Sequence, residues 1–172
     1  MKIERPQAGE YPVYFEAYVN RVAGSDLLPE LEKGKKGMLD FFSSIPDDKH
    51  NYRYAEGKWT IKEILSHVID AERIFIYRAL RFSRNDSTAL PGFDEDEYVP
   101  QSNAVNRTIE HLLKEYAAVR EATIAFFESL TEEMSLRQGN SNGKAVSVRA
   151  FGYMIQGHQQ HHIDVIKQRY LA

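Results

Sequence analysis

Apolar residues recur at helical spacing in four long segments of the chain, with polar and charged residues between them. This pattern predicts four helices, because an apolar stripe that repeats every three to four residues marks the buried face of an amphipathic helix. A shorter helix is predicted over residues 11–22, with Pro12 tolerated in its first turn. Strand-like alternation never extends beyond a few residues. The long predicted helices cover residues 27–44, 61–82, 107–130 and 148–170.

The second long helix has the clearest start signal. Thr60 is followed three residues later by Glu63, the spacing of a capping box, and Trp59 and Ile64 occupy the two positions of a hydrophobic staple. No Pro or Gly interrupts the chain from there to about Phe82. The other long helices have predicted caps at Ser25 or Asp26, at Asn106 and at Ser147.

Two long connections separate the later helices. Residues 83–105 carry prolines and many acidic side chains, and residues 131–146 carry two glycines, so both are predicted to be loops. The first is long enough to cross the molecule and let the second and third helices run parallel, and we expect it to cover a pocket. We therefore predict an all-α fold, a four-helix bundle with a long crossover loop between helices 2 and 3.

Composition places this bundle in one soluble domain. A chain of 172 residues, 42% of them apolar, can build a single core, so residues 1–172 are predicted to form one domain. The sequence has no Cys, which excludes disulfides, cysteine-based zinc sites and a cysteine nucleophile. The net charge of −3 shows no basic excess, so nucleic acid is not an expected partner. No signal peptide and no apolar run of ~20 residues is visible, so we expect a cytoplasmic protein without a membrane partner.

Two histidines of the last helix share its apolar face. His158 and His162 lie about 40° apart at 100° per residue, within the sector that carries Phe151 and Ile155. Imidazoles on an apolar stripe need partners for their nitrogens, and two rings one turn apart can chelate one ion. His161 lies at the edge of the sector and is the expected bystander, although His158 with His161 could also chelate. The competing interpretation is a pair of core histidines that hydrogen-bond to neighbours.

A metal site needs a third ligand, and three other histidines are available. His67 borders the apolar face of the second helix, whereas His50 falls in a loop and His111 lies in the first turn of the third helix. Taken alone, His67 is more typical of a boundary position than of a ligand. Three protein ligands would leave coordination positions open, which is typical of catalytic ions.

Charged residues near His67 have a structural and a functional interpretation. Glu63, Asp70, Arg78 and Arg81 flank it within about 60° of its helix, and each fits a solvated strip better than a contact with substrate. Arg120 falls among Tyr116, Thr123 and Phe127, where we predict a salt bridge to a carboxylate of the second helix.

Three motifs resemble the DinB-like superfamily, which includes metal-dependent hydrolases of the YfiT type. They are Lys58-Trp59-Thr60-Ile61-Lys62-Glu63-Ile64-Leu65-Ser66-His67-Val68-Ile69-Asp70-Ala71-Glu72-Arg73, Leu90-Pro91-Gly92-Phe93-Asp94-Glu95-Asp96 and Gly157-His158-Gln159-Gln160-His161-His162. The resemblance implies a four-helix bundle, often a homodimer, in which three histidines facially bind one divalent transition metal such as zinc, nickel or iron. The ligand positions then fall on His67, His158 and His162.

The same resemblance implies an enzyme acting on a small molecule. Relatives include bacillithiol S-transferases and a mycothiol-dependent maleylpyruvate isomerase, so the expected activity is thiol transfer or hydrolysis, and the expected partner is a small-molecule substrate such as a low-molecular-weight thiol. A non-catalytic bundle that binds or senses a metal or ligand is the alternative. A purely structural module with buried, metal-free histidines is a third possibility. The resemblance assigns no general acid or base.

Overall fold

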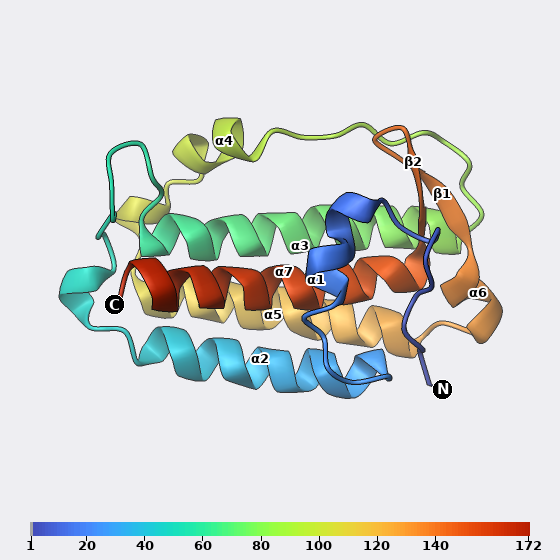
Figure 1. Ribbon diagram of the computed structural model, residues 1–172, viewed down its shortest axis with the longest axis horizontal. Coiled ribbons are helices and arrows are strands. Elements are labelled where there is room, and N and C mark those ends of the chain that lie inside the picture. Colours follow the sequence, from blue (N-terminus) through green and yellow to red (C-terminus); the bar gives the residue numbers. More distant parts are fainter. Residues whose placement is uncertain (1) are drawn as a thin grey trace.

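Four long helices make up most of the computed structural model, which describes residues 2–172 (Figure 1). Their observed ends lie within two residues of the predicted ones, so the predicted all-α four-helix bundle is confirmed. No helix within residues 2–172 is both long enough and apolar enough to cross a bilayer. The four are α2 (Leu27–Ser43), α3 (Ile61–Ser83), α5 (Ile109–Glu128) and α7 (Val148–Arg169).

The predicted crossover is also confirmed, since α3 and α5 run parallel (Figure 1). Lys62 at the start of α3 donates to the carbonyl oxygens of Val105 and Arg107, just before α5, at 2.6 and 2.8 Å. Midway along the two helices, Arg120 of α5 forms an ion pair with Glu72 of α3. The segment between them therefore returns along the whole bundle, and α3 and α7 become antiparallel neighbours.

Capping explains where the helices begin. Thr60 Oγ1 accepts from Glu63 N at 3.1 Å and Glu63 Oε2 accepts from Thr60 N at 2.7 Å, so the predicted capping box of α3 is present. Ser147 caps α7 as predicted. The predicted cap of α5 at Asn106 is wrong. The N-cap is Thr108, whose extended backbone lets its hydroxyl accept from the amide of the third helical residue.

The region 131–146 is not the predicted loop. It contains a short helix and an antiparallel hairpin, in which Gln138 pairs with Ser147 and Ser141 with Lys144. The hairpin turns at Asn142-Gly143, where both residues have positive φ. An Asn-Gly pair favours this turn because both residues tolerate the left-handed conformation, and it is the signal that strand alternation alone missed. The elements are α6 (Glu132–Leu136), β1 (Gln138–Ser141) and β2 (Lys144–Ser147).

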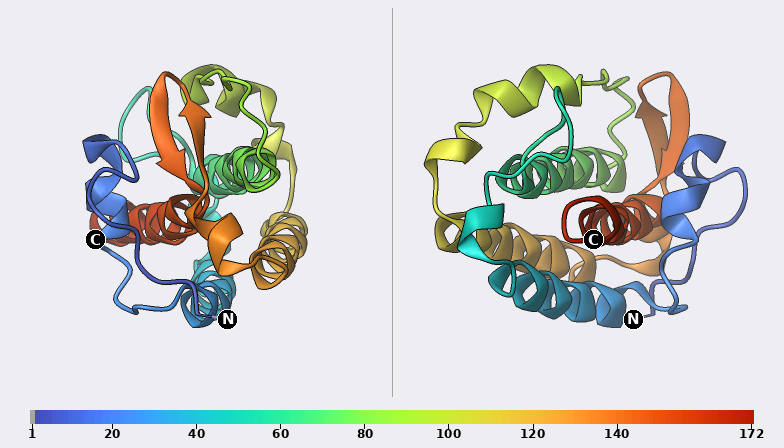
Figure 2. Two further views of the ribbon diagram at one scale, coloured as in Figure 1. Left: turned by 90° about the vertical axis from the view of Figure 1, so that its right-hand side faces the viewer. Right: turned by 60° about the vertical axis from the view of Figure 1, so that its left-hand side comes forward.

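The crossover segment contains three helical turns: α4 (Glu95–Tyr98) and the 3-10 turns η3 (Val99–Gln101) and η4 (Ala104–Asn106). The short helix predicted over residues 11–22 is shorter than expected, because the helical part is η1 (Val13–Phe15) followed by α1 (Glu16–Val19). This N-terminal segment packs on α7. Crossover, hairpin and N-terminal segment surround the face shared by α3 and α7 (Figure 2).

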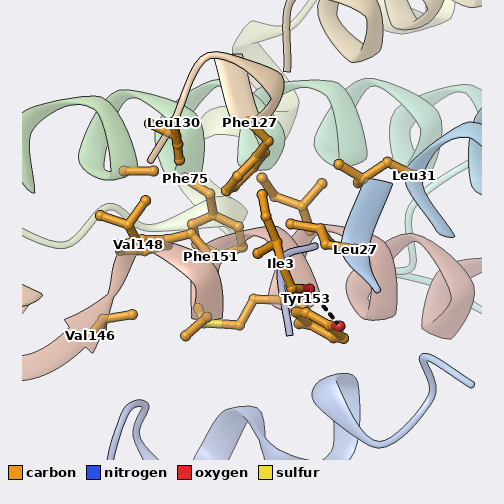
Figure 3. Close-up of a cluster of buried hydrophobic side chains, with 14 of the residues drawn as sticks. Ile3, Leu27, Leu31, Phe75, Phe127, Leu130, Val146, Val148, Phe151 and Tyr153 are labelled. Carbon is orange, nitrogen blue, oxygen red and sulfur yellow. Dashed lines mark hydrogen bonds between the residues drawn. The ribbon is translucent and has the colours of Figure 1, made fainter. Parts of the chain in front are cut away.

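Two apolar clusters fill the bundle with a polar layer between them. Figure 3 shows the first, where Phe151 and Tyr153 of α7 pack with Leu27 and Leu31 of α2. The second surrounds Tyr116 of α5 at the other end of the bundle. The layer between them holds the fully buried ion pair of Arg120 with Glu72, which confirms the predicted salt bridge to the second helix.

Candidate metal centre

The imidazoles of His67, His158 and His162 meet between α3 and α7. His67 Nε2 and His162 Nε2 each lie 3.0 Å from His158 Nε2. One nitrogen from each ring can be chosen so that all three lie within 4.8 Å of one another. The structure therefore brings together the three side chains that the sequence singled out.

Helix geometry sets the positions of these imidazoles, and burial sets their protonation. His158 and His162 are one turn apart on α7, and α3 runs antiparallel beside them to bring in His67. Only 7% of His67 and 8% of His158 is exposed, while His162 is half-buried. Burial lowers the pKa of His67 to about 4, and it holds the pKa of His158 and His162 well below the ordinary value. The rings are thus neutral at pH 7, as metal ligation requires.

The arrangement suits one divalent ion better than hydrogen bonding among the rings. A neutral imidazole has one N–H and one lone pair, so His158 Nε2 cannot form good hydrogen bonds to both neighbours at once. Two nitrogens about 2.1 Å from one ion would lie about 3.0 Å apart at a right angle and about 3.4 Å apart at a tetrahedral angle. The two separations of 3.0 Å that involve His158 fall at the short end of this range.

The other histidines lie outside the cluster. His161 packs against Tyr18, with ring centroids 5.3 Å apart, and is not part of the three-histidine group. His50 Nε2 lies 3.1 Å from the carbonyl oxygen of Ile45, and His111 is exposed at the start of α5. The His158 and His161 arrangement at spacing three is therefore not the one observed.

An open pocket of about 450 Å³ leads to the histidines. Trp59 lies beside His67 with ring centroids 4.8 Å apart, and Tyr18 lies beside His158 at 5.4 Å. Phe75 of α3 and Phe93 of the crossover extend this aromatic lining. A small molecule in the pocket would therefore touch aromatic walls and reach the three imidazoles.

The sequence profile of the DinB superfamily matches residues 30–166, which include all three histidines. The chain belongs to the DinB superfamily. An Oceanobacillus iheyensis protein named "Putative metal-dependent hydrolase" is 26% identical to this DinB protein over 144 residues, which are 81% of each chain. A Geobacillus thermodenitrificans protein of the same name is 30% identical over 92 residues, 52% of this chain and 51% of the relative.

The fold of this DinB protein is similar to that of a solved relative. YfiT from Bacillus subtilis, described as "a probable metal-dependent hydrolase with an unusual four-helix bundle topology", superposes with a TM-score of 0.75. The match covers 95% of this chain and 89% of YfiT at 14% sequence identity, so it concerns the fold alone.

The charged residues that flank His67 divide into two groups. Asp70 and Arg81 follow the solvated-strip interpretation, because they are partly exposed and pair with Arg73 and Asp86, whereas the Glu63 side chain is only 13% exposed and caps its own helix. Arg78 does not follow it, since it is buried and lines the pocket. The structure also adds lining residues that no sequence pattern had indicated, on the N-terminal segment and the hairpin: Phe15, Tyr18, Asn142, Lys144 and Val146.

Gly157, next to His158, lets the N-terminal segment of this DinB protein approach α7. A Cβ at this position would lie 1.9 Å from the backbone oxygen of Tyr18, a clash that no side-chain rotation relieves. We expect Gly157→Ala to lower the free energy of unfolding by about 1–3 kcal/mol, the usual cost of overpacking. Denaturant unfolding of chelator-treated protein measures this change, and the displaced Tyr18 ring would expose His158 to solvent.

Gly37→Ala is the matched control, because Gly37 is also inside a long helix but a Cβ there would meet nothing within 4 Å. Removing a helical glycine without a clash should stabilise the protein by roughly 0.5–1 kcal/mol. Glycine-to-alanine substitution is therefore expected to change the free energy of unfolding in opposite directions at the two positions. Equal effects at both sites would show that the segment carrying Tyr18 does not pack closely on α7.

Proposed function

We propose that this chain is an enzyme in which His67, His158 and His162 hold one divalent transition ion to hydrolyse a small molecule bound in the adjoining pocket. The observation that carries the proposal is the convergence of three imidazoles in the wall of an open pocket. Two relatives named as metal-dependent hydrolases support it. Zinc, nickel and iron all suit imidazole ligands, and each is a candidate for the ion.

The residues around the site would have distinct roles. The three histidines would leave coordination positions open, because a catalytic ion usually has three protein ligands. A bound divalent ion lowers the pKa of a coordinated water or thiol and so supplies a nucleophile at neutral pH. Trp59 and Tyr18, which lie beside His67 and His158, would hold the reacting part of a substrate against the histidines and keep bulk water away.

Thiol transfer is the second candidate, and the distribution of carboxylates favours it. Glu95 is the only carboxylate among the residues 2–172 that line the pocket, and it is exposed on α4. A metal-activated water is usually assisted by a nearby general base, whereas a thiol coordinated to the ion loses its proton outright. A low-molecular-weight thiol could therefore act as nucleophile here without a carboxylate beside the histidines.

The two candidates can be separated by one set of assays on protein purified without a nickel column and then loaded with zinc, nickel or iron. Hydrolysis predicts turnover of nitrophenyl esters without added thiol. Thiol transfer predicts turnover of an electrophilic aromatic halide only with glutathione, bacillithiol or mycothiol. Either activity should disappear with a chelator and return with the ion.

A protein that binds the ion tightly but turns over neither class of substrate would contradict the enzymatic proposal. That result would favour the alternative of a non-catalytic metal-binding or sensing bundle. A melting temperature unaffected by chelator and by added ions would contradict metal binding itself, because a ligand that binds only the folded state must stabilise it.

A further inference from the structure

Arg78 is a buried cation in the same pocket without a counter-charge in the described part of the chain. Only 7% of it is exposed, yet none of the salt bridges within residues 2–172 includes it. Its Nη2 donates to the carbonyl oxygen of Pro91 at 2.6 Å. Burial also lowers the pKa of Arg78 from its ordinary value. Keeping a buried charge unpaired is costly, and a ligand that supplies the missing anion would relieve this cost.

Arg78 and the metal centre lie on one face of α3. Arg78 follows His67 by eleven residues, which places the two about 20° apart around the helix and ~16 Å apart along it. Ala71 and Phe75 line the pocket between them. Side chains on a helix lean toward its N-terminus, which is the direction in which His67 lies from Arg78. One small molecule in the pocket could thus contact both Arg78 and the three histidines.

A second cation lies in the same pocket. Lys144 of β2 lines it, is exposed and takes part in no salt bridge within the described residues. The acidic lining residue, Glu95, acts electrostatically on Tyr18, which packs on His158 at the histidine end. Glu95 forms an ion pair with neither Arg78 nor Lys144 among the salt bridges within residues 2–172.

We propose that Arg78, assisted by Lys144, binds an oxyanion of the substrate, a carboxylate or a phosphate, while the apolar body lies over Ala71 and Phe75 and the reacting group faces the three histidines. The proposal rests on the proposed function and narrows its substrate class to small organic anions. A guanidinium suits this role because its planar N–H groups can bind two oxygens of a carboxylate or phosphate at once.

A purely structural role is the competing explanation, because Arg78 also holds the crossover through the Pro91 carbonyl. Two substitutions distinguish the roles. Arg78→Gln keeps an N–H donor for Pro91 but removes the charge, whereas Arg78→Lys keeps the charge. A loop anchor would tolerate glutamine, and an anion site would not. Arg84→Gln is the control, since Arg84 is exposed after the end of α3 and does not line the pocket.

The experiment is calorimetric titration of the 172-residue, metal-loaded protein with three probes of similar shape: 3-phenylpropionate, 3-phenylpropanamide and 2-phenylethylphosphonate. We expect wild type to bind at least one anion roughly 10-fold or more tightly than the neutral amide. Arg78→Gln should abolish this preference and Arg78→Lys should retain part of it. Lys144→Gln should reduce it a few-fold, and Arg84→Gln should leave it unchanged. A stronger preference for the phosphonate would assign phosphate as the bound group, and the reverse would assign carboxylate.

Equal affinity of wild type for the amide and both anions would overturn the proposal. So would a preference that survives in Arg78→Gln, because the ion or another cation would then hold the anion. Titration of chelator-treated protein measures anion binding without the ion. Its result for the anion site therefore does not depend on whether the enzymatic proposal holds. Anion preference without metal-dependent turnover would reject only the enzymatic proposal, and turnover without Arg78-dependent preference would reject only the anion site.

Discussion

His158→Ala is expected to weaken binding of the divalent ion by more than about 100-fold. The reason is its central place, with its Nε2 3.0 Å from the Nε2 atoms of both His67 and His162. Losing only an outer hydrogen-bond partner of a metal ligand costs roughly 10- to 100-fold in affinity, so losing a ligand itself should cost more. Metal analysis of protein purified without a nickel column, followed by competition with a chromophoric chelator, measures the change.

His161→Ala is the matched control. Both His158 and His161 pack on Tyr18, with ring centroids 5.4 and 5.3 Å away, so both variants lose an aromatic contact and an imidazole from the same helix. Only His158→Ala removes a member of the three-histidine group. Metal retained in His158→Ala and lost in His161→Ala would reject the ligand assignment.

A similar loss of affinity for the divalent ion is expected for His67→Ala, although His67 lies on a different helix. An ion held by α3 and α7 together stabilises the folded state, so adding it to chelator-treated wild type should raise the melting temperature. The rise should be much smaller in each of the three ligand variants. Equal rises in wild type and in His67→Ala would mean that the ion binds to α7 alone or elsewhere.

Helix periodicity explains why the bundle could be predicted. Thr60 and Glu63 cap α3, and Ser147 caps α7, through contacts within one turn that sequence spacing encodes. The cap of α5 was misplaced by two residues, because Asn106 and Thr108 are both good caps and the backbone of η4 decides between them. Boundaries that depend on a neighbouring turn cannot be predicted from residue type alone.

The three-histidine cluster can be predicted in part for the same reason. The angle between His158 and His162 follows from their spacing on one helix, but the approach of His67 depends on how α3 and α7 are aligned. That alignment results from packing between helices, and only the resemblance to the superfamily indicated it in the sequence. The solvated-strip interpretation of Arg78 is wrong because the crossover and the hairpin line the same pocket, and no helical period in the sequence indicates how they pack on α3.

Arg120→Met is expected to lower the free energy of unfolding by about 3–5 kcal/mol, the usual result of leaving one member of a buried ion pair alone. Arg120 Nε and Nη2 donate to the two carboxylate oxygens of Glu72, each at 2.8 Å, and neither side chain is more than 1% exposed. Burial opposes the charged form of Arg120, but Glu72 outweighs it and holds the pKa of the guanidinium above its ordinary value. Denaturant unfolding in the presence of chelator measures the loss without a contribution from the ion.

Arg21→Met provides the control, since Arg21 pairs with Asp164 at 3.5 Å where both side chains are about one-third exposed. A partly exposed pair contributes about 0–1 kcal/mol, so the same substitution should have little effect there. The double variant Glu72→Leu with Arg120→Met should recover most of the lost stability, because no uncompensated charge remains. A double variant as unstable as Arg120→Met would show that packing, and not the charge of Glu72, accounts for the loss.

The ion pair belongs to a polar layer that joins all four long helices, and this explains why a bundle would keep it. Arg120 Nη1 also donates to Gln156 Oε1 of α7 at 3.1 Å, and Gln159 Nε2 donates to the Gly34 carbonyl oxygen of α2 at 2.8 Å. Gln159 directly follows His158, so the layer fixes α7 against α3 beside the metal centre. The double variant should therefore regain stability yet bind the ion more weakly than wild type. Unchanged metal affinity in that variant would show that apolar packing alone aligns the three histidines.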